Sequence, residues 1–173
     1  MILPLADVPA PVVDYRELSP LMATLGGSVV VLMVGLLRPP FVRQVLVPAL
    51  TAISLLAGIG LTIWIWEPGD REPIIERAIA MDTLTLGVSM LFFVAGLVAI
   101  VLSLRSEAAR EAGHGEYYSL LLGSITGMIV LAGAENLITL FVGLELLSIP
   151  LYVLCATELR RRTSLESGLK YLV

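Results

Sequence analysis

The segment that says most about the structure of this chain is Leu137-Ile-Thr-Leu-Phe-Val-Gly-Leu-Glu-Leu-Leu-Ser-Ile-Pro-Leu-Tyr-Val-Leu-Cys155. It is apolar and close to the length of ~20 residues that a transmembrane helix needs. Its one acid, Glu145, would lie roughly 14 Å along a helix that begins near Asn136, at 1.5 Å per residue. That depth is about half of a ~30 Å hydrocarbon core. Because charge is costly in hydrocarbon, Glu145 is predicted to be a functional residue that takes up and releases protons.

The rest of the chain has the same character. Its 173 residues are 57% hydrophobic and 15% charged, with a mean hydropathy of +0.93, which is typical of polytopic membrane proteins. Apolar runs of membrane-spanning length occupy residues 20–37, 45–66, 82–104, 117–134 and 136–157, and another begins near Ser164. We therefore expect an all-α membrane protein with five complete transmembrane helices and the start of a sixth.

The arginines indicate the orientation of these helices. Seven lie in the first, third and fifth loops, whereas three lie in the N-terminal tail and the second loop: Arg38, Arg43, Arg105, Arg110, Arg160, Arg161 and Arg162 against Arg16, Arg71 and Arg77. The positive-inside rule then places the N-terminus outside and the first, third and fifth loops in the cytoplasm. Trp64 and Trp66 would lie at the outer interface, where indole rings are favoured. The expected location is the plasma (inner) membrane of a bacterium.

Glu145 shares its predicted helix face with Phe141, Ser148 and Tyr152, at spacings of four, three and seven residues. Pro150 cannot donate a backbone hydrogen bond to the carbonyl of Leu146, so the helix is expected to kink or to admit water there. A free carbonyl beside a carboxyl group suits a hydrated proton path.

Lys170 is the only lysine and stands six residues into the sixth run, roughly 9 Å from its start. The run opens with Thr163-Ser-Leu-Glu166, which has the spacing of a capping box. Two interpretations of Lys170 remain open. It can form a direct or water-bridged ion pair with Glu145 if the two helices are neighbours, or it can extend its ammonium group to the cytoplasmic interface.

Other polar residues have simpler interpretations. Glu135 is expected in the turn Gly133-Ala-Glu-Asn136, and Asp82 at the N-terminus of the third helix, where negative charge is favoured. Cys155 is expected to be a packing residue and His114 a loop residue. One cysteine and one histidine cannot hold an iron–sulfur cluster of the usual kind, and no basic face indicates nucleic acid. No metal or redox cofactor is expected in this chain.

Three segments closely resemble a known family: Gly115-Glu-Tyr-Tyr-Ser-Leu-Leu-Leu-Gly123, Ala132 to Tyr152 with its Gly-Leu-Glu-Leu element, and Ser164-Leu-Glu-Ser-Gly-Leu-Lys-Tyr171. They are similar to subunit N of the proton-pumping NADH-quinone oxidoreductase, respiratory complex I. The resemblance implies an antiporter-like subunit of about fourteen helices with two inverted five-helix repeats. Residues 1–115 would be a tail with three leading helices, and residues 116–173 the beginning of the first repeat.

The resemblance also implies roles. Glu145 matches the family's buried glutamate and Lys170 its sixth-helix lysine, both in proton translocation, while NAD and quinone are used by the whole complex. The implied partners are the other membrane-arm subunits and the lipid bilayer. Two alternatives stay open: a subunit of a multisubunit sodium/proton antiporter with no redox partner, and a membrane scaffold in which Glu145 only stabilises helix packing.

Overall fold

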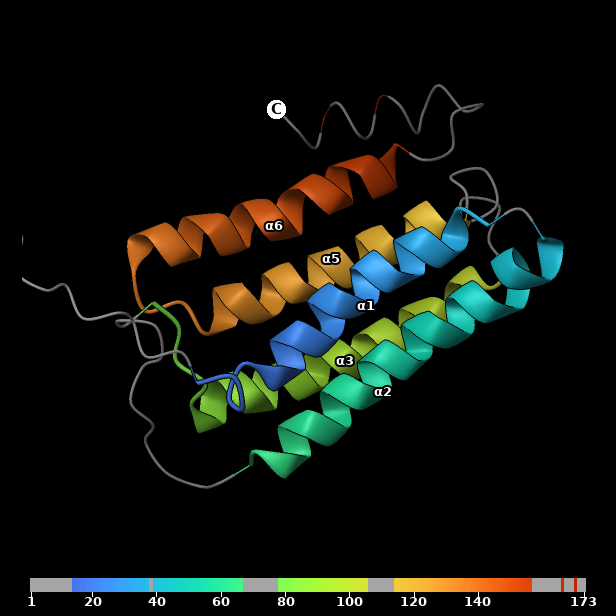
Figure 1. The fold of residues 1–173 in the computed structure, drawn as a ribbon. Helices are drawn as coiled ribbons and strands as arrows, with labels where there is room; N and C mark the ends of the chain where they lie inside the picture. Colours follow the sequence, from blue (N-terminus) through green and yellow to red (C-terminus); the bar gives the residue numbers. More distant parts are fainter. Residues whose placement is uncertain are drawn as a thin grey trace, which may run out of the picture.

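A computed structural model describes residues 14–37, 39–66, 78–105 and 114–156, together with Glu166 and Lys170. Its helices run antiparallel to their chain neighbours and form an elongated bundle (Figure 1). The helices are α1 (Ser19–Gly35), α2 (Val47–Trp64), α3 (Thr83–Ser103), α5 (His114–Ala132) and α6 (Leu137–Cys155), and a π-helical turn η1 (Val42–Leu46) leads into α2. The five expected helices are therefore confirmed, each to within a few residues of the predicted run.

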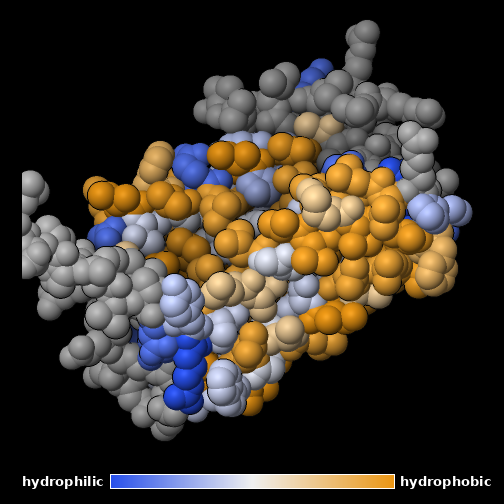
Figure 2. All heavy atoms as spheres, in the orientation of Figure 1, coloured by the Kyte–Doolittle hydropathy of each residue, from blue (hydrophilic) through white to orange (hydrophobic). Residues whose placement is uncertain are grey.

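Four of the helical segments in the described residues are long and apolar enough to cross a membrane, and α1 is a shorter apolar helix of 17 residues. At 1.5 Å per residue α1 is about 26 Å long, near the lower limit for a membrane span. Figure 2 shows apolar residues covering most of the visible face of the helices. The chain is thus an all-α multi-pass membrane protein, as its composition predicts.

Local sequence explains where the helices begin. The side chain of Asp82 accepts a hydrogen bond of 2.8 Å from the backbone N–H of Thr85, and Asn136 accepts one of 2.8 Å from Thr139. Both are N-caps, so the expectations for the start of α3 and α6 are confirmed. His114 is the first residue of α5 rather than a loop residue, which corrects the prediction.

The π-helical turn before α2 follows from Pro48. Proline has no N–H to donate to the carbonyl four residues earlier, which disturbs the α-helical ladder just before it. The N–H of Val47 instead donates to the carbonyl of Val42, five residues back, which is the π-helical spacing.

Helix α5 is the centre of the bundle, because it contacts α1, α2, α3 and α6, whereas α6 packs chiefly on α5. Side-chain hydrogen bonds join α5 to α1. Thr126 donates to the hydroxyl of Thr24 in α1 over 3.0 Å, and Ser119 donates to the carbonyl of Ser28 over 2.9 Å. Such hydrogen bonds between helices set their register in an apolar environment, where apolar side chains discriminate little between registers.

Short contacts fix one end of the bundle. Ile79 forms an isolated antiparallel bridge with Ala134, and the N–H of Glu135 donates to the carbonyl of Ala78 over 3.1 Å. The guanidinium of Arg16 lies 5.2 Å from the centroid of the Trp64 ring at the same end, as a cation–π pair. The tail, the end of α2 and the α5–α6 turn therefore share one end, as the alternating topology predicts.

Candidate functional site

Helix α6 carries the principal candidate residue, and its contact with α5 is unusually close. A Cβ atom on Gly127 of α5 would lie 2.6 Å from the carbonyl carbon of Leu146, and one on Gly143 of α6 would lie 2.8 Å from the nitrogen of Leu131. Real Cβ atoms do not approach so closely, so glycine at these positions lets the two backbones meet. Gly123 has an ordinary contact distance of 3.7 Å to Pro150.

Two consecutive glycines of α1 behave differently from each other. A Cβ on Gly27 of α1 would overlap the side chain of Ser54 in α2, whereas one on Gly26 would meet nothing within 4 Å. Gly27 and Gly127 are therefore positions at which a neighbouring helix comes close. Gly26 is not such a position and points away from the neighbouring helices.

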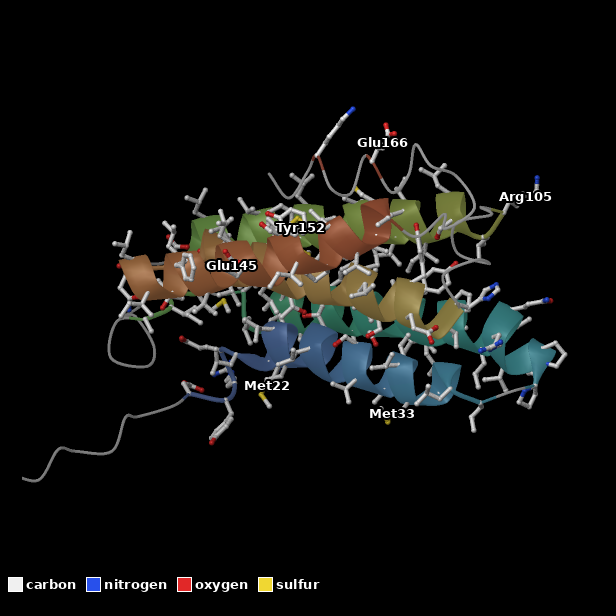
Figure 3. All side chains as sticks on the ribbon, turned by 90° about the horizontal axis from the view of Figure 1, so that it is seen from above. Met22, Met33, Arg105, Glu145, Tyr152 and Glu166 are labelled. Carbon is white, nitrogen blue, oxygen red and sulfur yellow. The ribbon has the colours of Figure 1, made fainter. Side chains whose placement is uncertain are left out.

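Glu145 lies on the side of α6 that faces away from α5. The contact face of α6 holds Gly143 and Pro150, the buried residues of this helix, and at 100° per residue Glu145 is about 160° from Gly143. Tyr152, two turns further on, follows Glu145 along the same side (Figure 3). Both are partly buried, while Phe141 on the same face is 60% exposed. The predicted common face of Glu145, Phe141, Ser148 and Tyr152 is thus confirmed.

The surroundings of Glu145 are apolar and open. Large hydrophobic side chains of α6 are exposed around it, namely Leu137, Ile138, Leu140, Phe141, Val142, Leu144, Ile149 and Val153. Within the described part of the chain, Glu145 makes no hydrogen bond or ion pair. The hydroxyl of Ser148 is occupied by the carbonyl of Leu144, to which it donates over 2.6 Å.

Helix α6 runs through Pro150 and ends at Cys155. Since Pro150 has no N–H, the Leu146 carbonyl lacks its usual helical donor, and Gly127 places this backbone against α5. Cys155 is exposed rather than packed, which corrects the expectation for that residue.

Lys170 adopts helical backbone geometry, as does Glu166, and both side chains are exposed. Figure 3 shows Glu166 with its carboxylate directed away from the helical bundle. The proposed capping residue Thr163 and the arginines 160–162 lie outside the described residues. Among the described residues, no ion pair joins Glu145 to Lys170, and their partnership stays a prediction.

No metal centre is formed by the residues that the structure covers. They contain no group of three or more histidine, cysteine, aspartate or glutamate side chains placed to hold an ion. The structure shows one carboxyl group, that of Glu145, on an apolar helix face that is turned away from α5.

Comparison with known proteins agrees with this arrangement. Residues 134–173, which begin at the α5–α6 turn, match a family described as NADH:quinone oxidoreductase/Mrp antiporter, transmembrane. NADH-quinone oxidoreductase subunit N of Chloroflexus aggregans is 34% identical over 165 residues, which is 94% of this chain and 33% of that protein. The corresponding protein of Desulfitobacterium hafniense is 36% identical over 154 residues, 88% of this chain and 30% of that protein.

A solved structure is similar as well. One chain of respiratory complex I from Thermus thermophilus with bound aureothin superposes with a TM-score of 0.69 at 28% identity, covering 88% of this chain and 32% of that chain. The expected resemblance to subunit N is therefore confirmed over nearly the whole sequence. The chain spans about a third of the length of the curated relatives that it matches.

Proposed function

We propose, from its similarity to subunit N of bacterial NADH-quinone oxidoreductases along nearly its whole length, that this chain is part of a membrane-arm subunit of complex I. That subunit would help to couple quinone reduction to proton translocation. NADH oxidation and the redox centres would belong to other subunits, and this chain would contribute protonatable side chains. Its partners would be neighbouring membrane-arm subunits and lipid.

The observation that carries the proposal is the position of Glu145. It lies near the middle of an apolar helix and faces away from the contact with α5. Ionisable residues in membrane spans face the interior of a bundle or a hydrated cavity and mark ion or proton pathways. The uncovered side of α6 would therefore be closed by the remaining two thirds of the subunit.

In the proposed chemistry, the protonation of Glu145 is coupled to the position of a nearby positive charge. A cation close to Glu145 stabilises the carboxylate, and withdrawal of that cation favours uptake of a proton. Lys170 is the residue of this chain assigned to the relay, as a positive charge that responds to the state of Glu145. In this scheme protons are the only species transferred by the chain itself.

Glu145→Gln in the full-length subunit of the assembled complex tests the proposal. Glutamine keeps the size of the protonated side chain but cannot exchange a proton, so NADH-driven proton pumping is expected to fall about 10²-fold, as when a positioned proton-transfer group is lost. Glu135→Gln is the matched control, because Glu135 is an exposed acid in a turn. Unchanged pumping per assembled complex in Glu145→Gln would leave only the scaffold role.

The family description also names the Mrp antiporter, which supports a second candidate, a subunit of a sodium/proton antiporter. The two candidates differ in their energy source. Proton movement in vesicles that starts on addition of NADH and stops with a quinone-site inhibitor supports the first. Sodium-dependent proton exchange without NADH would support the second.

A further inference from the structure

A second carboxyl group of the bundle has an unsatisfied atom. Glu116 lies in the first turn of α5, and its Oε2 atom is buried without a hydrogen-bond partner among the described residues. A buried acceptor without a donor is costly. In the working protein such an oxygen can be satisfied by bound water or by a proton on the carboxyl group itself.

The helical register places Glu116 on the α6 side of α5. Gly123 and Gly127, seven and eleven residues later, share its face and are the positions at which α5 meets Pro150 and Leu146 of α6. Glu116 therefore lies at one end of the α5–α6 contact, on the helix pair that also carries Glu145. It is at the opposite end of that contact from the turn containing Glu135.

The backbone around Glu116 is held firmly. The backbones of Gly115 and Gly35 in α1 are in direct contact, since a Cβ on Gly115 would lie 2.6 Å from the Cα of Gly35. Tyr117 and Tyr118 form an edge-to-face pair with ring centroids 5.3 Å apart, and the Tyr118 hydroxyl lies 3.3 Å from Oγ of Ser103 in α3. The carboxyl group therefore has little freedom to leave this site by movement of its helix.

The charged groups at this end leave Oε2 unsatisfied. Arg43 in η1 and Arg105 after α3 are exposed, and His114 is partly buried two residues before Glu116. None of these side chains supplies a hydrogen bond to Oε2. The two arginines mark this end as the one that the positive-inside rule predicts to be cytoplasmic.

We propose that Glu116 is a second proton-transfer residue, which takes up protons from water at the cytoplasmic end of the α5–α6 contact. In the uptake step an O–H bond of a hydronium ion breaks, an O–H bond forms on the carboxylate, and water is released. In the release step the O–H bond of the carboxyl group breaks, and a water molecule on the membrane side of the site accepts the proton as hydronium. This inference rests on the proposed function, because it needs a proton-translocating subunit in which to act.

The test uses the full-length subunit in the assembled complex, in inverted membrane vesicles. Glu116→Gln is expected to lower NADH-driven proton pumping per complex about 10²-fold, while Glu116→Asp, which keeps a carboxyl group, retains a larger part of it. Glu135→Gln is the control at the other end of α5. An infrared difference spectrum between the oxidised and reduced complex should lose a carboxyl band in Glu116→Gln.

A purely structural role gives the opposite pattern. If Glu116 only stabilised the N-terminus of α5, Glu116→Gln would lower the amount of assembled complex but leave pumping per complex and the infrared band unchanged, and the inference would be wrong. Glu145→Gln, measured in parallel, separates the two proposals. Loss of pumping in Glu145→Gln but not in Glu116→Gln overturns the role of Glu116 alone, whereas full pumping in both overturns the proposed function.

Discussion

At the scale of single residues, a few polar side chains decide where helices begin. Asp82 and Asn136 each accept a hydrogen bond from the N–H three residues later, which satisfies a donor that the helix itself leaves free. Asp82 has a further effect through Thr85, the residue whose N–H donates to it. The hydroxyl of Thr85 donates to the carbonyl of Ala132 in α5 over 3.3 Å. The cap therefore helps to align α3 with α5.

Asp82→Ala is expected to destabilise the protein by about 1 kcal/mol, the usual cost of losing an N-cap. Asp82→Asn, which keeps an oxygen acceptor, should behave almost like the unmodified protein. Thermal unfolding in detergent compares the three. Equal loss in both variants would mean that the charge of Asp82, rather than its acceptor oxygen, supports the helix.

Lys170 gives a prediction about charge. If its ammonium group takes part in the proton relay, Lys170→Met should lower NADH-driven pumping in the assembled complex about 10²-fold, whereas Lys170→Arg, which keeps the positive charge, should retain part of it. If Lys170 only reaches the membrane interface, both variants should pump normally. Pumping rates divided by the amount of assembled complex distinguish the two results.

At the scale of helices, the contact between α5 and α6 determines where Glu145 points. Gly127 and Gly143 bring the backbones together on one side of α6, so the residues half a turn away necessarily face outward. The outward face holds large apolar side chains together with Ser148, Tyr152 and one partly buried acid, Glu145. A rotation of α6 about its own axis would move Glu145 away from this outward-facing position.

Gly127→Ala should therefore separate α5 from α6 and lower stability and assembly. Its added methyl group would meet the backbone of Leu146 and Leu147, which cannot move aside as a flexible side chain could, and overpacking of this kind costs about 1–3 kcal/mol. Gly26→Ala is the control, since nothing lies within 4 Å of the added atom. It should be neutral or stabilising by up to about 1 kcal/mol from helix propensity. Equal melting temperatures for the two variants would contradict the close contact.

At the scale of the whole molecule, α5 holds the other helices together. It contacts the three leading helices as well as α6, so the predicted boundary at residue 115 separates segments that pack into one bundle. Arg16, Trp64, Ile79 and Ala134 gather at one end, and the exposed Arg43 and Arg105 lie in the connections at the other. The orientation of the bundle in the membrane remains the prediction made from the arginines.

Labelling of single cysteines tests that orientation. In a Cys155→Ser background, Glu135→Cys should react with a membrane-impermeant maleimide from outside the cell, because Glu135 is exposed in the predicted outer turn. Arg105→Cys should react only when the reagent reaches the cytoplasmic side. The opposite pattern would mean that the N-terminus is inside.

The membrane class and the approximate bounds of the helices in the described residues could be predicted from the amino-acid sequence. Each depends on the composition and length of a local apolar run or on a cap within it. The sequence also singled out Glu145, since a charge inside such a run is visible without coordinates. It did not reveal the unsatisfied oxygen of Glu116, whose spacing at the start of α5 looks like that of any first-turn acid. The packing of the helices was needed to learn which glycines admit a neighbouring helix and which side of α6 remains open. Both features depend on how each helix is rotated about its own axis. Because a membrane helix has apolar residues on all sides, its hydrophobic pattern does not determine this rotation, and contacts with neighbouring helices do.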